Sequence, residues 1–168
     1  LADRLAGVRT LVSGAAPLSP AVFRAYEELG SLVWEGYGLT EAAPVVASTM
    51  VHQRPKPGSV GAPLPGVEVR LVDEDGADAD EDDPGEIWVR GANLFSGYWP
   101  DGDGGPDADG WYATGDVAYS DDEGDLHLVD RRRDLVIVSG FNVYPFEVET
   151  VISAHPDVAE VAVVGVPD

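Results

Sequence analysis

Three side chains in one glycine-containing segment have the chemistry to bind a nucleotide. The segment covers residues 35–41, and its two glycines give the backbone freedom around the aromatic ring of Tyr37. Thr40 can donate a hydrogen bond to a phosphate oxygen, and Glu41 can reach Mg²⁺, which prefers oxygen ligands. The same residues also fit a glycine-rich turn from a strand into a helix that the threonine caps. The segment alone does not decide between these two interpretations.

Two later segments add groups of the same kind. The tripeptide Thr114-Gly115-Asp116 ends in a carboxylate, which can accept hydrogen bonds from the two hydroxyls of a ribose. It is also a common turn tripeptide. The run 130–134 places three arginines in succession, either in a functional site or in an exposed basic turn between strands. Each segment is a weak indication by itself, and their order along the chain favours a shared site.

The charge and composition limit the possible partners. The 168 residues carry 31 Asp and Glu against 10 Lys and Arg, a net charge of -21, and 44% of them are hydrophobic. A chain of this kind can form one domain, or one domain and part of another. Its negative field repels nucleic acids and anionic membranes, so a nucleotide site must be shielded by Mg²⁺ and arginine side chains. The absence of cysteine excludes disulfides and cysteine-ligated zinc, and no apolar run is long enough to span a bilayer.

The first part of the chain has the pattern of a parallel α/β sheet. An apolar run over 8–13 predicts a strand, and the Ser-Pro pair at 19–20 predicts the start of a helix that ends before Gly30. Residues 31–35 predict the next strand. Because ligands bind at the carboxyl ends of such strands, the loop at 14–17 and the glycine-containing segment are the expected binding loops. The side chains expected on the apolar face of the helix are Val22, Tyr26 and Leu29.

The rest of the chain is expected to form short strands and one further helix. Alternating apolar residues at both ends of 67–89 predict two strands joined by an acidic hairpin loop. Apolar runs at 126–129 and 135–138 predict strands on either side of the basic run, and Pro145 starts a helix. The run 158–166 predicts a final strand.

The chain resembles the superfamily of adenylate-forming enzymes, which includes acyl-CoA synthetases, non-ribosomal adenylation domains and luciferases. The most specific stretches are Tyr37-Gly-Leu-Thr-Glu41, Thr114-Gly-Asp116 and the run from 130 to 145. In that family a carboxylate attacks the α-phosphate of ATP to give an acyl-adenylate and pyrophosphate, and a thiol then displaces AMP. The segment 138–145 is most similar to the version found in fatty-acyl-CoA ligases.

The resemblance implies a two-part architecture. Residues 1–129 would be the distal part of the large AMP-binding N-terminal domain, an α/β unit that ends a parallel sheet and continues into a distorted β-barrel. Residues 130–133 would be the hinge, and 134–168 would begin a small α+β C-terminal domain. The family's lysine-bearing phosphate loop would precede Leu1, and its C-terminal lysine would follow Asp168. The chain is therefore expected to be a fragment that does not turn over by itself.

The resemblance also implies a role for each residue of the nucleotide site. Tyr37 would stack on adenine, and Thr40 would bind a phosphate. Glu41 would hold Mg²⁺. Asp116 and Arg131 would bind the ribose hydroxyls. The residues expected to lie against the nucleotide through their backbone are Gly14, Ala15, Ala16, Pro17 and Gly38.

The thioester-forming step is expected to depend on the end of the chain. Arg133 would be the pivot, at a position where relatives usually have Lys or Asp, and Gly140 and Phe141 would line the pantetheine channel. Thr40, Glu41 and Arg133 are thus the expected catalytic residues. The expected function is an AMP-forming fatty-acid–CoA ligase in the cytoplasm that uses a small carboxylic acid, ATP, Mg²⁺ and coenzyme A. The alternatives are an aryl-acid ligase, an adenylation domain that loads a carrier protein, and a non-catalytic nucleotide-binding remnant.

Overall fold

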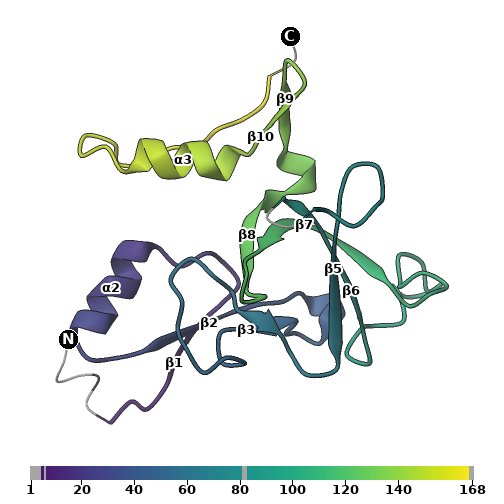
Figure 1. Ribbon diagram of the computed structural model, residues 1–168, viewed down its shortest axis with the longest axis horizontal. Coiled ribbons are helices and arrows are strands. Elements are labelled where there is room, and N and C mark those ends of the chain that lie inside the picture. The colour runs from purple at the N-terminus through teal and green to yellow at the C-terminus, as the bar shows by residue number, and fades with distance from the viewer. Residues whose placement is uncertain (1–4, 6, 81–82, 167–168) are drawn as a thin grey trace.

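The computed structural model describes residues 5, 7–80 and 83–166 of the chain. These residues form two four-stranded sheets and a two-stranded hairpin, which projects from one end of the second sheet (Figure 1). The mixture of an α/β part and a β part confirms the predicted fold class. In the part of the chain so described, no helix is both long enough and apolar enough to cross a membrane.

The first sheet has the predicted parallel start. In spatial order its strands are β1 (Leu11–Ser13), β2 (Val33–Tyr37), β3 (Ala47–Ser48) and β4 (Ala62–Pro63). β1 and β2 are parallel, whereas β3 pairs antiparallel with both β2 and β4. The helix α2 (Pro20–Glu28) connects the two parallel strands, because a parallel pair needs a crossover of this kind.

The ends of α2 follow the predicted capping chemistry, but its buried face does not. The Ser19 hydroxyl accepts a hydrogen bond from a first-turn amide at 3.3 Å, and Gly30 has a φ of 74° just beyond the last turn. The predicted apolar face is wrong. Phe23 is the buried side chain, with 4% exposed, whereas Val22 and Leu29 are 42% and 39% exposed. The helix thus packs inward through Phe23, while Tyr26, also part of the predicted face, is only half-buried.

The second sheet is an antiparallel meander. Its strands are β5 (Val67–Val72), β6 (Gly85–Gly91), β7 (Tyr112–Ser120) and β8 (Leu126–Arg131), paired in sequence order. Ile87 and Val89 are fully buried, as their alternation predicts. Within the described residues the sheet does not close into a barrel, because β5 and β8 are its two edges. A bridge between Gly61 and Leu126 instead connects β8 to the residues that precede β4.

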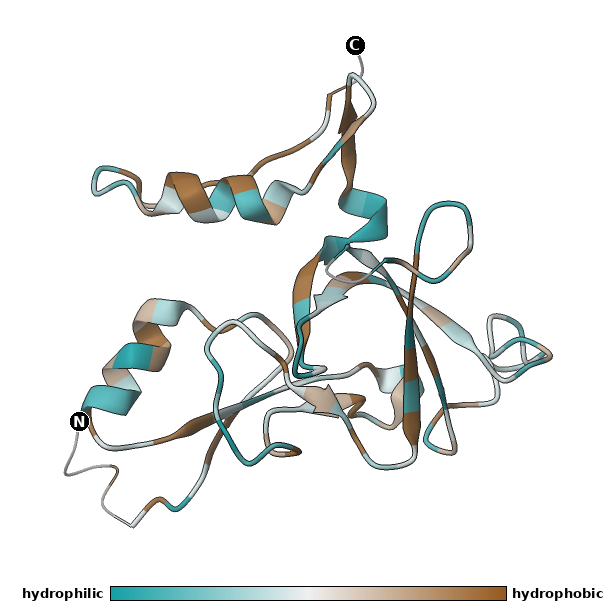
Figure 2. Ribbon diagram, in the orientation of Figure 1, coloured by the Kyte–Doolittle hydropathy of each residue, from teal (hydrophilic) through white to brown (hydrophobic). Residues whose placement is uncertain are grey.

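One hydrophobic core joins the two sheets. In Figure 2 the hydrophobic residues are concentrated on the strands, and most peripheral loops are teal or white. The buried members of the core are Tyr37, Ala42, Val46, Ala47, Val60, Ile87, Val89, Ala118 and Leu126. Because the last residue of β2 is among them, the core fixes the glycine-containing segment against the second sheet.

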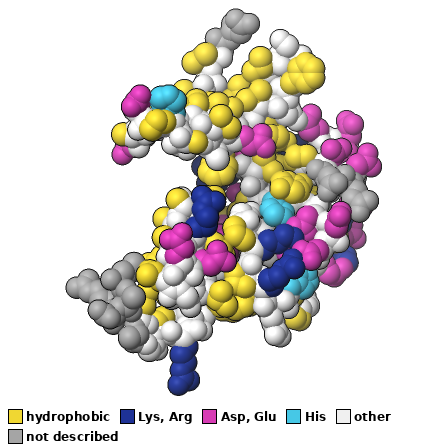
Figure 3. All heavy atoms as spheres, turned by 60° about the vertical axis from the view of Figure 1, so that its left-hand side comes forward, with side chains coloured by type: hydrophobic (Ala, Val, Ile, Leu, Met, Phe, Trp, Pro, Cys, Tyr) yellow, Lys and Arg dark blue, Asp and Glu magenta, His cyan; other side chains and the backbone are white. Residues whose placement is uncertain are grey.

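The C-terminal part of the chain stands apart from this core. It consists of the 3₁₀ helix η2 (Arg132–Asp134), the strands β9 (Val136–Val138) and β10 (Phe141–Val143), and the helix α3 (Pro145–Ser153). β9 and β10 form an antiparallel hairpin, and α3 begins at the predicted proline. Hydrophobic side chains are prominent on this end of the surface (Figure 3).

The predicted final strand over 158–166 is wrong. The described residues in this run belong to no strand. The amide of Val163 donates to the carboxylate of Glu149 at 2.8 Å, and Val164 and Val166 are 76% and 81% exposed. An apolar run becomes a buried strand only where a neighbouring strand and a covering layer are present. The described part of the chain provides neither for this run.

Candidate active site

A cavity of about 530 Å³ lies where the residues after β2, the middle of β7 and the end of β8 meet. Its walls come from all three segments that the sequence analysis singled out. The lining residues are Leu39, Glu41, Tyr112, Thr114, Gly115, Asp116, Arg131, Arg132 and Arg133. The cavity therefore combines three arginines with two carboxylates, which gives it a local positive charge in a chain with a net charge of -21.

Asp116 is held between two partners. It lies opposite Arg131 in the β7–β8 register, and the Arg131 Nε is 3.5 Å from its Oδ1. Its Oδ2 accepts a hydrogen bond of 2.7 Å from the hydroxyl of Tyr37. The Asp116 side chain is nevertheless 23% exposed. A carboxylate fixed in this way can accept hydrogen bonds from a diol in the cavity without first being reoriented.

Tyr37 supports Asp116 from the core. Its ring belongs to the hydrophobic core, and the residue is only 7% exposed. Burial, and then the negative charge of Asp116, raises the pKa of the Tyr37 hydroxyl, which therefore stays protonated and donates. Tyr37 is not among the residues that line the cavity. Its expected stacking on adenine stays a prediction. Its observed contact is the hydrogen bond to Asp116, the candidate ribose-binding residue.

Glu41 is anchored by a tyrosine that sequence reasoning missed. The hydroxyl of Tyr98 donates to Oε1 of Glu41, and the amide of Phe95 donates to the Glu41 carbonyl oxygen at 2.8 Å. The hydrogen bond to Glu41 is the main cause that raises the pKa of Tyr98 to about 12. The rings of Phe95 and Tyr98 pack edge to face with centroids 5.0 Å apart. No sequence pattern indicates this contact, because 57 residues separate its partners.

The carboxylate of Glu41 fits a Mg²⁺ ligand. Mg²⁺ in nucleotide sites is usually held by one or two carboxylates together with phosphate oxygens and water. Glu41 lines the cavity, and within the described residues a hydrogen bond is made to its Oε1 only. Its other oxygen is therefore available as a ligand while Tyr98 keeps the side chain in place.

Thr40 does not cap the helix that follows β2. The 3₁₀ helix η1 (Thr40–Ala42) begins at this residue, and its N-cap is Leu39, whose side chain makes no capping bond. The alternative of a capping threonine is therefore wrong. Thr40 is exposed beside Glu41 and does not line the cavity. Its contact with a phosphate stays a prediction.

The loop at 14–17 lies beside β2 but outside the cavity lining. A Cβ atom on Gly14 would lie 3.5 Å from the carbonyl oxygen of Gly36, so the two binding loops approach each other closely. All four residues of this loop are exposed. Gly38 has a clear structural reason to be glycine, since a Cβ atom there would come within 1.8 Å of the Pro44 carbonyl oxygen. The role of these residues at adenine stays a prediction.

Glu35 is a second side chain that sequence reasoning missed. It is 6% exposed, and its Oε1 has no hydrogen-bond partner within the described residues. Burial raises its pKa, and a hydrogen bond from the backbone of Leu18 opposes that shift. The Glu35 amide donates to the buried hydroxyl of Thr49 at 2.9 Å, which fixes this end of β2. A buried carboxylate that is not fully satisfied, next to an expected binding loop, is a feature that needs an explanation.

The residues expected at the pantetheine channel lie away from the cavity. Gly140 has a φ of 84° in the turn between β9 and β10, and Phe141 is 75% exposed. Neither residue lines the cavity. Arg133 does line it, and its ion-pair partner is the adjacent Asp134 at 3.6 Å. The roles of all three in thioester formation stay predictions.

Three carboxylates outside the cavity are grouped around a lysine. Oxygens of Asp121, Glu123 and Asp125 lie within 4.8 Å of one another, which is close enough to hold a metal ion. Lys56 fills this position, with its Nζ at 2.5, 2.7 and 3.5 Å from the three carboxylates. Hydrogen bonds to Asp121 and Glu123 raise the pKa of Lys56, so the lysine stays charged. The group therefore fastens the loop before β4 to the β7–β8 turn.

A comparison with family models assigns the chain. Residues 1–99 match the model described as AMP-binding enzyme. The chain belongs to the AMP-binding enzyme family. This assignment confirms the resemblance that the three segments indicated, and the cavity is formed by those same segments.

Individual members of the AMP-binding family align with nearly the whole chain. It is 46% identical over 164 residues to a long-chain-fatty-acid–CoA ligase of Yersinia pestis, covering 96% of the chain and 29% of that protein. The structure of ATP-bound MatB from Rhodopseudomonas palustris matches with a TM-score of 0.87 and 41% identity, covering 95% of this chain and 32% of that one. The o-succinylbenzoate CoA synthetase of Bacillus subtilis, in complex with its acyl-adenylate intermediate, matches with a TM-score of 0.83 and 34% identity, over 96% and 34% of the two chains. The chain thus spans about a third or less of each of these proteins.

Proposed function

We propose that this chain is part of an AMP-forming fatty-acyl-CoA synthetase. Such an enzyme activates a carboxylic acid with ATP to an acyl-adenylate and then transfers the acyl group to coenzyme A. The observation that carries the proposal is the cavity in which Glu41, Asp116 and Arg131 meet, because these residues come from three separate family motifs. The 46% identity to a long-chain-fatty-acid–CoA ligase supports the choice of acid.

The proposed ribose site consists of Asp116 and Arg131. The Asp116 carboxylate would accept hydrogen bonds from the two ribose hydroxyls. Arg131 would balance the charge of this carboxylate, and the Tyr37 hydroxyl would keep it oriented. Such an arrangement contributes to catalysis by positioning, since it fixes the nucleotide before the reacting atoms meet. The adenine would then lie toward the loop at 14–17.

The proposed phosphate end of the site lies at η1. Glu41 would hold Mg²⁺, with Tyr98 fixing its carboxylate, and Thr40 would donate to a phosphate oxygen. When bound, Mg²⁺ neutralises the charge that develops on the phosphates of a phosphoryl or adenylyl transfer. Arg131 and Arg133, which line the cavity, add fixed positive charge on the same side of the nucleotide.

The proposed domain organisation follows from the same motifs. Residues 1–129 would belong to the large AMP-binding domain, 130–133 to the hinge and 134–168 to the small domain. The position of Arg133 between the cavity and the hairpin is consistent with a pivot. Gly140 and Phe141 would approach the nucleotide site only after the small domain has turned.

An aryl acid is the second candidate substrate. The specific observation in its favour is the match to an o-succinylbenzoate CoA synthetase at 34% identity. We prefer a fatty acid because the sequence identity to the fatty-acid ligase is higher than that to the o-succinylbenzoate CoA synthetase, over a similar share of the chain.

The proposal is tested by product analysis on the complete protein that contains residues 1–168. The protein is incubated with ATP, Mg²⁺, coenzyme A and one acid at a time, from medium- and long-chain fatty acids to benzoate derivatives, and acyl-CoA is measured by mass spectrometry. We expect fatty acyl-CoA and AMP in equal amounts. Product with aryl acids alone would establish the second candidate. Adenylate formation without transfer to coenzyme A would indicate a carrier-protein acceptor, and AMP binding without any product would indicate a non-catalytic remnant.

A further inference from the structure

Glu86 connects the cavity to the C-terminal part of the chain. This residue of β6 has a side chain that is only 8% exposed. Its Oε1 accepts a hydrogen bond from the amide of Gly115 at 3.1 Å, and its Oε2 accepts one from the indole of Trp88 at 3.3 Å. The same Oε2 also accepts from Nη1 of Arg132. One buried carboxylate thus joins β6, β7 and η2.

On the cavity side, Glu86 helps to shape the turn that presents Asp116. The register of β6 and β7 shifts between Glu86 and Trp88, so residues 114–116 bulge out of the regular ladder. Gly115 in this bulge has a φ of 78°, and its amide points to the Glu86 carboxylate instead of a strand carbonyl. Glu86 therefore supplies a hydrogen bond that the interrupted ladder lacks, at the residue directly before Asp116.

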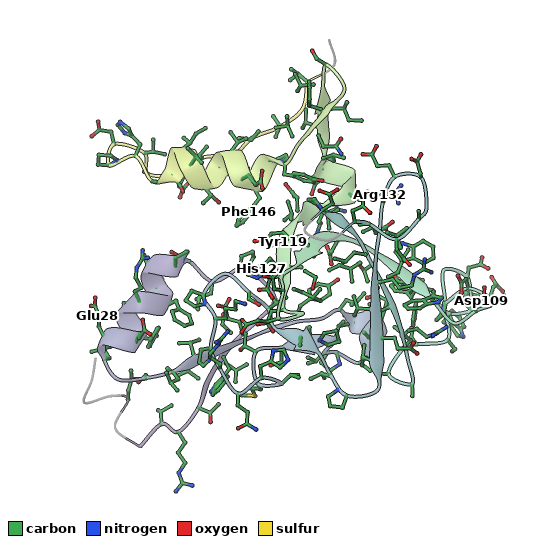
Figure 4. All side chains as sticks on the ribbon, in the orientation of Figure 1. Glu28, Asp109, Tyr119, His127, Arg132 and Phe146 are labelled. Carbon is green, nitrogen blue, oxygen red and sulfur yellow. The ribbon has the colours of Figure 1, made fainter. Side chains whose placement is uncertain are left out.

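On the other side, Glu86 holds the base of the C-terminal part. Figure 4 places Arg132 at the junction between the second sheet and this part of the chain. Arg132 directly precedes Arg133, the proposed pivot, and its side chain is 52% exposed while that of Glu86 is buried. Among the described residues, the C-terminal part makes two more polar contacts to the rest of the chain, from Asn142 to Glu74 at 2.8 Å and from the Phe146 amide to Asp130 at 3.0 Å. Both are made between exposed groups, whereas the Arg132–Glu86 pair has a buried carboxylate, so water competes less with this pair.

We propose that Glu86 is a positioning residue that ties the ribose-binding turn to the fixed side of the pivot. Through the Gly115 amide it holds Asp116, and through Arg132 it confines movement of residues 134–166 to the chain beyond Arg133. The two effects are linked, because the Gly115 amide and the Arg132 side chain both bind the Glu86 carboxylate, so the loss of one contact alters the other. The inference rests on the proposed nucleotide site for its effect on AMP, but its effect on the C-terminal part is independent of that proposal.

The coupling is tested by a double-mutant cycle in the complete protein. AMP affinity is measured by calorimetry for the unaltered protein and for Glu86→Gln, Arg132→Gln and the double variant. We expect each single variant to bind AMP about tenfold more weakly than the unaltered protein. We expect the double variant to bind AMP as tightly as the single variant with the lower affinity. If the losses of affinity in the two single variants multiply in the double variant, Arg132 acts on the nucleotide directly and the proposal is overturned. Unchanged AMP affinity in both single variants would also overturn it. Asp78→Asn is the matched control, because it breaks the exposed ion pair with Arg70 in the same sheet.

A second measurement keeps the proposal testable if Glu86→Gln does not fold. Residues 1–168 contain no cysteine, so spin labels can be placed in this region at Asp122→Cys and Ala154→Cys, both at exposed positions. We expect Arg132→Gln to broaden the distribution of distances between the labels, and Asp78→Asn to leave it unchanged. A distribution of the same width in Arg132→Gln would overturn the proposal. A broadened distribution in a protein that binds no AMP would leave this inference standing and contradict the proposed function.

Discussion

The hydrogen bond from Tyr37 to Asp116 separates two roles for this tyrosine. Removing only the hydroxyl, in Tyr37→Phe, keeps the aromatic ring in the core and removes the donor that lies 2.7 Å from Asp116 Oδ2. If the residue acted only by stacking its ring on adenine, phenylalanine would serve equally well. If it orients the ribose-binding carboxylate, the loss of the donor must weaken nucleotide binding.

The expected size of the effect follows from the environment of Asp116. A hydrogen bond to a charged group contributes about 1.5–3 kcal/mol when its partner is left unsatisfied. Asp116 is 23% exposed and keeps its ion pair with Arg131, so water and the arginine replace part of the loss. We therefore expect a loss of binding free energy slightly below this range, about 1.4 kcal/mol, which corresponds to about a tenfold increase in the Kd for AMP.

The assay is calorimetric titration of AMP into the complete protein that contains this chain. Tyr119→Phe is the matched control, because Tyr119 lies in β7, stacks on His127 at 4.8 Å and has no hydroxyl partner within the described residues. Figure 4 labels this pair of rings beside β8. We expect the control to bind AMP as the unaltered protein does. Unchanged affinity in Tyr37→Phe would refute the reasoning that Tyr37 acts through Asp116.

Three further perturbations test other parts of the site and fold. Tyr98→Phe removes the donor that fixes Glu41, and we expect pyrophosphate exchange to need several-fold more Mg²⁺, whereas an unchanged Mg²⁺ titration would contradict this role. Burial raises the folded-state pKa of Glu35 above its ordinary 4.5. The contribution of this carboxyl group to folding stability is therefore fully present below pH 4.5, and it is lost as the pH rises through the raised folded-state pKa. Glu35→Gln should therefore resist urea better than the unaltered protein at pH 8, with a smaller gain at pH 5, and a gain independent of pH would argue against a charged Glu35. Lys56→Met leaves three carboxylates facing one another, so we expect a lower Tm that salt partly restores, and a salt-independent loss would point to packing instead.

Local features of the fold could be predicted from the sequence because their causes are local. The Ser19-Pro20 start of α2, the glycine after its end and the Pro145 start of α3 all depend on the chemistry of a few adjacent residues. The alternation around Ile87 likewise identifies a buried strand face. These elements fall where they were predicted, within one or two residues.

Features that depend on distant partners could not be predicted in the same way. The run 158–166 has the composition of a strand, but the described residues include no strand that pairs with its backbone. Phe23 is buried because of how α2 meets the sheet, which its own periodicity does not reveal. Whether the second sheet closes depends on the neighbours of β5 and β8, and residue patterns do not specify them.

The candidate site shows the same division. Residue types and the family motifs identified Glu41, Asp116 and Arg131, and the structure brings them to one cavity. The side chains that hold them, Tyr98 and Glu86, were not predicted, because each acts across the fold on a residue far away in sequence. Motifs thus indicate candidate ligand-binding groups more readily than the side chains that hold them in position.

Adenylate formation by the complete protein that contains this chain can be measured as acid-dependent exchange of labelled pyrophosphate into ATP. We expect exchange that requires a fatty acid and Mg²⁺. We also expect Asp116→Asn, which keeps the shape of the side chain, to lower this exchange at least tenfold at limiting ATP. A folded protein that binds AMP but exchanges pyrophosphate with no acid, fatty or aryl, would contradict the claim that the cavity between β2, β7 and β8 belongs to an adenylate-forming enzyme.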